Sequence, residues 1–124
     1  MQGNETILLV DDEEGVRRLS ASILRRQGFQ VLEAESGKDA LRVVEENKGA
    51  EIHLLLSDMS MPDLDGQELA KRLRETRPDL KVLLTSGLSE EDMEHEKPKD
   101  LGMAFIQKPF SSSSLTLKIK ELLG

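Results

Sequence analysis

The sequence predicts an α/β fold in which a parallel sheet of five strands is covered by helices on both faces. Strand-like and helix-like stretches alternate along the whole chain of 124 residues. The strand-like stretches are short and almost entirely apolar, as is usual for strands buried on both faces of a parallel sheet. Parallel neighbours also need a crossover connection, which a helix supplies and which is nearly always right-handed. We therefore expect one doubly wound domain over residues 1–124.

The spacing of the apolar residues changes between the first expected strand and the first expected helix. Residues 7–10 (ILLV) form an uninterrupted apolar run, which is typical of a buried strand. From residue 14 to residue 27 the apolar side chains return at helical spacing instead, and Gly28 is a suitable helix stop. The residues expected on the buried face of this helix are Val16, Leu19, Ile23 and Leu24.

The second unit repeats this arrangement. Residues 30–34 (QVLEA) are expected to form a strand, and Ser36 and Gly37 a turn that starts the helix. The helix is expected to end at residues 47–49, where Asn and Gly occur. Its buried stripe is expected to contain Ala40, Leu41, Val43 and Val44.

The third strand is expected at residues 52–57 (IHLLLS), where a nearly continuous apolar run stops at Asp58. Residues 59–66 are expected to form a loop in which the methionines fill gaps in the packing. The next helix must end before Pro78, because a proline disfavours helical geometry in the residue that precedes it. The inward residues of this helix are expected to be Leu69, Ala70 and Leu73.

The last two strands are expected at residues 82–85 (VLLT) and 103–107 (MAFIQ). Between them, residues 89–99 carry five acids and one apolar anchor, so we expect a short helix there with few core contacts. Residues 108–110 are expected to form a loop, and a serine of the run 111–114 to cap the terminal helix. That helix is expected to bury Leu115, Leu117, Ile119, Leu122 and Leu123.

Charge and composition exclude several classes of function. The chain has 24 acidic and 17 basic residues, a net charge of −7, and three aromatic residues. It therefore lacks the basic surface and the stacking side chains that nucleic-acid binding requires. The absence of cysteine excludes disulfides, thiolate metal sites and a thiol nucleophile. Because no apolar run is long enough to cross a bilayer and no targeting segment is recognisable, we expect a cytoplasmic domain without membrane contact.

Polar side chains follow four of the expected strands at the point where each apolar run stops. They are Asp11, Asp12, Asp58, Ser86 and Lys108. The carboxyl ends of parallel strands share one edge, where open α/β sheets bind their ligands, so we expect these groups to lie together. Clustered carboxylates repel one another unless a cation lies among them, and Mg²⁺ prefers such oxygen ligands. With Mg²⁺ and Lys108 neutralising a phosphoryl group, Asp58 is the candidate nucleophile.

Four segments of the chain resemble the signature blocks of the receiver domains of two-component response regulators. They are LLVDDE at 8–13, SDMSMPDLDG at 57–66, LLTSG at 83–87 and QKPF at 107–110. The resemblance covers essentially the whole chain in the family's order. It implies a flavodoxin-like doubly wound (βα)₅ fold with the strand order 2-1-3-4-5.

The resemblance also implies roles for the acidic residues. Asp58 would be the phosphorylated aspartate. Asp12 would bind Mg²⁺ directly, and Asp11 mainly through water. Ser60, two residues after the nucleophile, would offer its backbone carbonyl to the metal.

Three further residues would act on or after phosphorylation. Lys108 resembles the phosphate-binding lysine and Ser86 the switch hydroxyl, which would donate a hydrogen bond to the new phosphoryl group. Phe105 stands at the position of the switch aromatic, and it is equally compatible with a plain core aromatic of its strand. Its inward turn would reshape the surface formed by residues 89–99, the last strand and the terminal helix.

The partners implied by the resemblance are a sensor histidine kinase or a histidine phosphotransfer protein, which would supply a phosphohistidine. A phosphorylation-dependent homodimer is a further state that the family allows. The domain would catalyse its own phosphorylation and dephosphorylation without being a conventional enzyme. Residues 3–6 (GNET), the LLTSG block and QKPFS at 107–111 look most like receivers at the carboxyl terminus of hybrid sensor histidine kinases, and a stand-alone regulator without an output domain fits almost as well.

Competing motifs find no support in the sequence. A calcium loop that starts at Asp58 would need glycine at its sixth position, where Asp63 stands. No phosphate-binding or dinucleotide-binding glycine motif follows any expected strand. The remaining alternative is an unphosphorylated protein-interaction module with the same fold, against which the intact set of Asp11, Asp12, Asp58, Ser86 and Lys108 argues.

Overall fold

The computed structural model describes residues 5–87, 103–108 and 110–124. Its strands are β1 (Thr6–Val10), β2 (Gln30–Ala34), β3 (Leu54–Asp58), β4 (Lys81–Ser86) and β5 (Met103–Gln107). The helices in this part of the chain are α1 (Glu14–Arg26), α2 (Gly37–Glu46), α3 (Gly66–Thr76) and α5 (Ser112–Leu123). The helix expected over residues 89–99 and Pro109 of the expected loop lie outside the described residues. None of the helices described here combines the length and apolar character needed to cross a bilayer.

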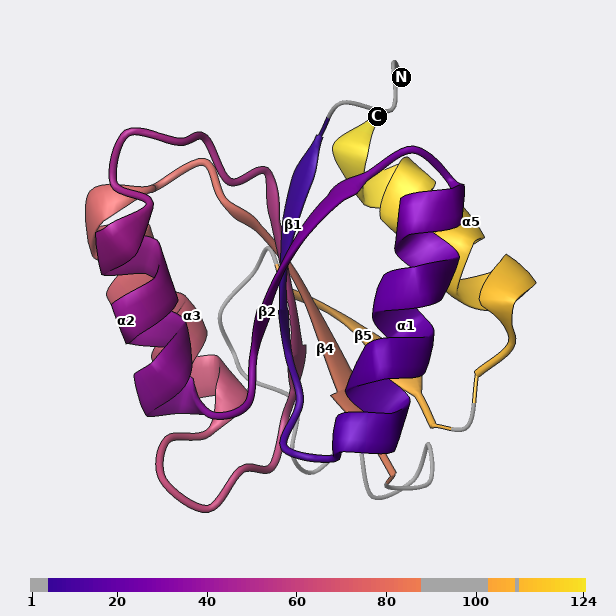
Figure 1. Cartoon of the computed structure of the whole chain (residues 1–124), viewed down its shortest axis with the longest axis horizontal. Coiled ribbons are helices and arrows are strands. Elements are labelled where there is room, and N and C mark those ends of the chain that lie inside the picture. Colours follow the sequence, from indigo (N-terminus) through magenta and orange to yellow (C-terminus); the bar gives the residue numbers. More distant parts are fainter. Residues whose placement is uncertain (1–4, 88–102, 109) are drawn as a thin grey trace.

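The strands form one parallel sheet in the order β2-β1-β3-β4-β5, which confirms the predicted α/β fold and strand order. Helices α2 and α3 cover one face of this sheet, and α1 and α5 cover the other (Figure 1). Strand β1 pairs with both β2 and β3, so that Val10 lies opposite Ala34 on one side and Ser57 on the other. The strand order reverses at β1, because β2 lies on one side of it and β3 to β5 lie on the other. Open α/β sheets bind ligands beyond the strand ends at such a switch point.

The sheet separates two hydrophobic clusters, and the central strands contribute to both. Successive side chains of a strand point to opposite faces. In β1, Leu8 and Val10 accordingly pack into the cluster under α2 and α3, whereas Ile7 and Leu9 pack into the cluster under α1 and α5. All four side chains are buried. This two-sided burial explains why β1 is an unbroken apolar run without the alternation of a half-exposed strand.

Two leucines expected to be buried are exposed. Leu19 of α1 is 64% exposed and Leu117 of α5 is 61% exposed. In α1 the buried positions are Ser20, Ala21 and Leu24, because small side chains let this helix lie close to the sheet. In α5 the buried Leu115 and Ile119 are four residues apart, and a residue two positions from each faces away on a helix. The prediction was therefore wrong for these two side chains.

The limits of three strands differ slightly from those expected. Strand β1 begins at Thr6 and strand β4 at Lys81, each one residue earlier than expected. Strand β3 runs from Leu54 to Asp58, two residues later at its start than expected, and it includes the aspartate as its last residue. Strand β4 likewise extends to Ser86. Both polar residues thus belong to the ends of strands, where the backbone ladder fixes their positions.

The local helix signals are confirmed. Ser36 caps α2 by accepting a hydrogen bond from the backbone N–H of Asp39 at 3.0 Å. Ser111 caps α5 by accepting one from the N–H of Ser114, also at 3.0 Å. Gly28 follows α1 with a φ of 96°, a conformation that favours glycine.

Replacing Gly66 with alanine is expected to destabilise the fold by about 1–3 kcal/mol, the usual cost of overpacking. A Cβ on Gly66 would lie 2.6 Å from the carbonyl oxygen of Asp58 and 3.2 Å from the Cα of Met59. Because both neighbours are backbone atoms, they cannot move aside as a side chain would. Urea unfolding followed by far-UV circular dichroism measures the difference.

The matched control for Gly66→Ala is Gly15→Ala. Gly15 lies in α1, and a Cβ there would meet nothing within 4 Å. That substitution is expected to stabilise the helix by about 0.5 kcal/mol, because alanine restricts the unfolded chain. Equal effects of the two substitutions would contradict the close approach of α3 to the end of β3.

Candidate metal centre at the carboxyl edge of the sheet

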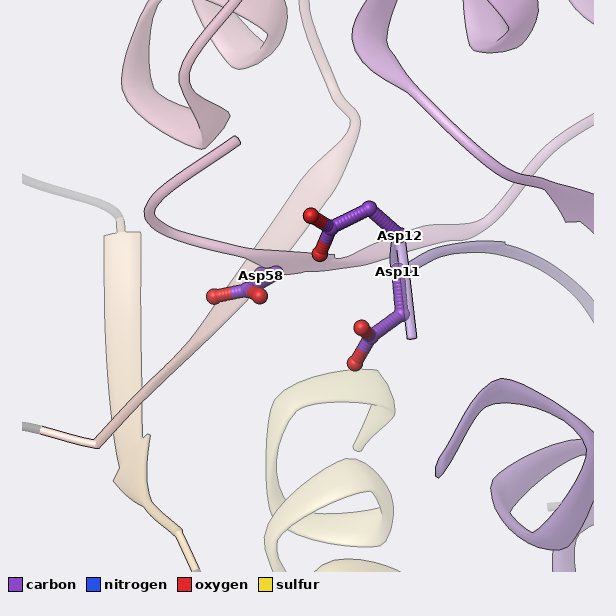
Figure 2. A group of neighbouring side chains, drawn as sticks. All are labelled: Asp11, Asp12 and Asp58. Atoms are coloured by element: carbon purple, nitrogen blue, oxygen red, sulfur yellow. The ribbon is translucent and has the colours of Figure 1, made fainter. Parts of the chain in front are cut away.

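Three carboxylates lie together beyond the ends of β1 and β3 (Figure 2). Asp11, Asp12 and Asp58 each offer one oxygen atom, and these atoms all lie within 4.8 Å of one another. Asp11 is buried, Asp58 is half-buried and Asp12 is exposed. The sheet register brings β1 and β3 side by side, so the acid cluster follows directly from where their apolar runs stop.

Asp11 is held by both its backbone and its side chain. Its N–H donates to the carbonyl of Ala34 at 3.2 Å, which extends the β1–β2 ladder by one bond. Its Oδ1 accepts from the N–H of Glu13 at 2.9 Å. Asp58 is supported in a similar way, because its Oδ1 accepts from the N–H of Ser60 at 3.3 Å. Both carboxylates are thus oriented by backbone donors before any ligand arrives.

Lys108 completes the site from the end of β5. Its Nζ lies 3.1 Å from Oδ2 of Asp11 and 3.4 Å from Oδ2 of Asp58. Its backbone N–H donates to the carbonyl of Ser86 at 2.6 Å. Glu13 adds a weaker ion pair, with its Oε1 3.7 Å from the same Nζ. The expected gathering of strand-end residues at one edge is therefore observed for the acids and the lysine.

Burial and charge shift the acid–base properties of this site. Burial raises the pKa of Asp58, and the positive charge of Lys108 only partly offsets that effect. Burial alone would lower the pKa of Lys108, but its hydrogen bond and ion pair with Asp11, together with the charge of Asp58, raise that pKa overall. The lysine stays protonated at neutral pH, while the nucleophile candidate is less acidic than a free aspartate.

The donor set fits a hard divalent cation. The three clustered groups are carboxylates, and Mg²⁺ is bound in proteins through one or two carboxylates with water and phosphate oxygens in the remaining positions. Among the described residues, Lys108 is the cation that pairs with these acids, so three carboxylates and one ammonium leave a net negative site, which favours a cation. Ser60 is exposed beside Asp58, and a role of its carbonyl as a ligand stays a prediction.

The two expected switch residues occupy different surroundings. Ser86 is the last residue of β4, is 4% exposed, and lies at the same sheet edge as the acids. Phe105 lies in the middle of β5, opposite Leu84, and packs half-buried against the cluster under α2 and α3. Phe105 therefore lies apart from the polar cluster, and its role as the switch aromatic stays a prediction.

The sequence reasoning missed a support for the loop after β3. The carboxylate of Asp63 accepts hydrogen bonds from the N–H groups of Gly37 at 3.3 Å and Lys38 at 2.9 Å, at the start of α2. These bonds, that of Lys38 first, lower the pKa of Asp63. The loop residues Met59 and Met61 are buried in the adjacent core, which confirms their expected packing role. An acid that caps a helix 26 residues away leaves no local signal in the sequence.

Comparison with known proteins places this arrangement in context. The family model of the response regulator receiver domain matches residues 7–120. The sensor kinase CckA of Brucella abortus (strain 2308) is 40% identical over 123 residues, which are 99% of this chain and 13% of that protein. Sporulation initiation phosphotransferase F of Bacillus subtilis (strain 168) is 33% identical over 121 residues, 97% of this chain and 94% of that protein.

Solved structures agree with these matches. The crystal structure of the receiver domain from the hybrid histidine kinase CckA is 37% identical and superimposes with a TM-score of 0.80. The match covers 96% of this chain and 99% of that one. This chain thus corresponds to a small part of the CckA sensor kinase and to nearly the full length of the phosphotransferase.

Proposed function

The chain belongs to the response regulator receiver domain family, and on that basis we propose that it accepts a phosphoryl group on Asp58 from a phosphohistidine of a partner protein. The observation that carries this proposal is the cluster of Asp11, Asp12 and Asp58 with the Lys108 ammonium among them. A degenerate receiver used only for protein contacts would have no need to keep this combination of charges. The intact cluster therefore favours the phosphoacceptor over the unphosphorylated interaction module.

The chemistry assigns one step to each group. A carboxylate oxygen of Asp58 attacks the phosphorus atom in line, and the bond from phosphorus to the donor imidazole nitrogen breaks. The leaving nitrogen keeps the electron pair of that bond, and an acyl phosphate remains on Asp58. Lys108 stabilises the negative charge on the transferring oxygens. When bound by Asp11, Asp12 and Asp58, Mg²⁺ would supply further charge neutralisation.

The output of this reaction would be a change of surface. The acyl phosphate adds charge and acceptor oxygens at the sheet edge, and Ser86, which ends the strand next to β3, would donate a hydrogen bond to them. Movement of Ser86 would let Phe105 turn inward and alter the surface of residues 89–99, β5 and α5. Unchanged amide hydrogen exchange over residues 88–110 on phosphorylation would contradict this switch.

The family also suggests the partners and the setting. A sensor histidine kinase or a histidine phosphotransfer protein would be the donor, and phosphorylation could pair two copies of the chain. The similarity to the CckA receiver is compatible with a hybrid-kinase parent, and the similarity to the phosphotransferase is compatible with a stand-alone regulator. In either setting we propose a single cytoplasmic receiver domain over residues 1–124.

Incubation of the chain with acetyl phosphate or phosphoramidate tests the proposed function. In the presence of Mg²⁺, intact mass spectrometry is expected to show one phosphoryl adduct per chain, and chelation of the metal with EDTA is expected to abolish it. A beryllium fluoride complex, which mimics the acyl phosphate, provides the check against rapid hydrolysis. If neither the adduct nor the beryllium fluoride complex formed with Mg²⁺ present, the interaction-module function would replace the phosphoacceptor.

A further inference from the structure

Arg17 links the acidic loop to the edge of the sheet, although it lies outside the cluster that would bind the metal. It occupies the first turn of α1, and its side chain is 12% exposed. Its Nη1 donates to the backbone carbonyl of Asp11 at 2.9 Å. Its Nε lies 3.5 Å from Oε1 of Glu33 on β2. One guanidinium thus joins the turn after β1 to the neighbouring strand.

The carbonyl that Arg17 holds belongs to the peptide between the two adjacent acids. A peptide unit is planar, so fixing the Asp11 carbonyl also fixes the N–H and the Cα of Asp12. Among the residues that the structure describes, none donates a hydrogen bond to the exposed Asp12 carboxylate. The direction of the Asp12 side chain therefore depends on its backbone, and the Arg17 side chain holds that backbone.

We propose that Arg17 is a positioning residue, which orients the Asp11–Asp12 peptide so that both carboxylates meet a divalent cation with Asp58. This inference rests on the proposed function, because the cation is the one expected at that site. Groups that orient metal ligands without touching the metal typically change metal affinity by about 10–100-fold when they are removed. Arg17 reaches the ligands through a main-chain carbonyl, and Glu33 in turn fixes the guanidinium.

The charge of Arg17 and its positioning contact are expected to change Mg²⁺ affinity in opposite directions. A guanidinium near the site repels a divalent cation, so removing its charge would strengthen cation binding if electrostatics dominated. Removing a positioning contact weakens cation binding instead. The sign of the change in Mg²⁺ affinity therefore distinguishes a positioning role from a simple contribution to the local field.

The test is a titration of isotopically labelled protein with Mg²⁺ alone, in which the amide chemical shifts of residues near the site give the dissociation constant. We expect Arg17→Gln to weaken Mg²⁺ binding by about tenfold. The matched control is Arg18→Gln, since Arg18 is the next residue on α1, is 72% exposed and pairs only with Glu14 in the described part of the chain. Arg18→Gln removes the same charge and is expected to change the affinity by less than about twofold.

A second variant at the same position keeps the positive charge, and a folding control accompanies every variant. Arg17→Lys keeps the charge but lacks the planar fork that reaches both Asp11 and Glu33, so it is expected to weaken Mg²⁺ binding by a smaller factor than Arg17→Gln. Far-UV circular dichroism establishes that each variant is folded. A positioning role also predicts that the rate of phosphorylation recovers at saturating Mg²⁺, because the rate then no longer depends on Mg²⁺ affinity.

Each outcome decides between the inference and the function on which it rests. Wild-type affinity, or tighter Mg²⁺ binding, in folded Arg17→Gln and Arg17→Lys proteins would overturn the positioning role and leave the proposed function intact. A wild-type chain that bound no Mg²⁺ would overturn the proposed function and the inference with it. Weaker binding in both Arg17 variants, with Arg18→Gln unaffected, supports the positioning role.

Discussion

Replacing Asp58 with asparagine is expected to abolish the Mg²⁺-dependent phosphoryl adduct and, at the same time, to stabilise the fold. The adduct is lost because an amide oxygen is a far poorer nucleophile than a carboxylate. The fold gains stability because Asp58 is half-buried beside Asp11 and carries a raised pKa. Removing one of the clustered negative charges at neutral pH is expected to add about 0.5–2 kcal/mol to the free energy of unfolding.

The pH dependence of this gain follows from the direction of the shift. A carboxyl group whose pKa is raised by folding binds its proton more tightly in the folded state, so its contribution to stability falls as pH rises through the raised pKa. The advantage of Asp58→Asn is therefore largest at neutral pH and shrinks as the solution becomes acidic. Thermal unfolding by circular dichroism at several pH values measures it.

The control for Asp58→Asn is the same change at Asp79, an exposed acid in the turn before β4. Asp79→Asn is expected to keep the phosphoryl adduct and to leave stability nearly unchanged. A phosphoryl adduct of full yield on the Asp58→Asn protein would place the nucleophile elsewhere. A loss of stability at neutral pH in that variant would contradict the cost of burying the charged Asp58 carboxylate.

Replacing Lys108 with methionine is expected to slow phosphorylation by about 10²–10³-fold at saturating Mg²⁺, the usual cost of removing a group that stabilises developing charge. Methionine keeps an apolar stem of similar length, so the effect isolates the ammonium. The same substitution is expected to tighten Mg²⁺ binding. The Nζ lies 3.1 Å from Oδ2 of Asp11 and 3.4 Å from Oδ2 of Asp58. It therefore competes with Mg²⁺ for these oxygens, and its positive charge repels the metal ion.

Two measurements test the Lys108 prediction, because the phosphorylation rate is expected to fall and the Mg²⁺ affinity to rise. The rate is followed by intact mass against time with acetyl phosphate, and the affinity by Mg²⁺ titration. Lys120→Met, an exposed position on α5, controls for net charge and is expected to change neither result appreciably. If Lys108→Met weakened Mg²⁺ binding and left the rate unchanged, the lysine would serve the fold and not the transferring phosphoryl group.

Most of the fold could be predicted because its signals are local. The apolar runs of β1 and β3 reflect burial on both faces of the sheet, and the limits of β2 and β5 agree with those expected. The errors at Leu19 and Leu117 arose where apolar residues occur more often than one helical face can hold. Which of them is buried depends on how closely the helix approaches the sheet, and the sequence of that helix alone does not contain this information.

The candidate site likewise contains contacts that the sequence predicts and contacts that it does not. Parallel topology alone predicts that Asp11, Asp58 and Lys108 meet at one edge, because each follows a strand end, and the structure brings them together. The contacts of Arg17 with the Asp11 carbonyl and of Asp63 with the start of α2 were not predicted. Both join side chains to backbone groups of another segment, and such pairings appear only once the elements are packed.

The ion pairs of Lys108 join parts of the chain that are made at very different times during translation. The lysine lies 97 residues after Asp11 and 50 residues after Asp58. A nascent chain therefore carries Asp11, Asp12 and Asp58 before Lys108 is added. Until Lys108 is made, the acid cluster lacks the ammonium group that pairs with Asp11 and Asp58, so the complete site forms only after the last strand of the sheet has been synthesised.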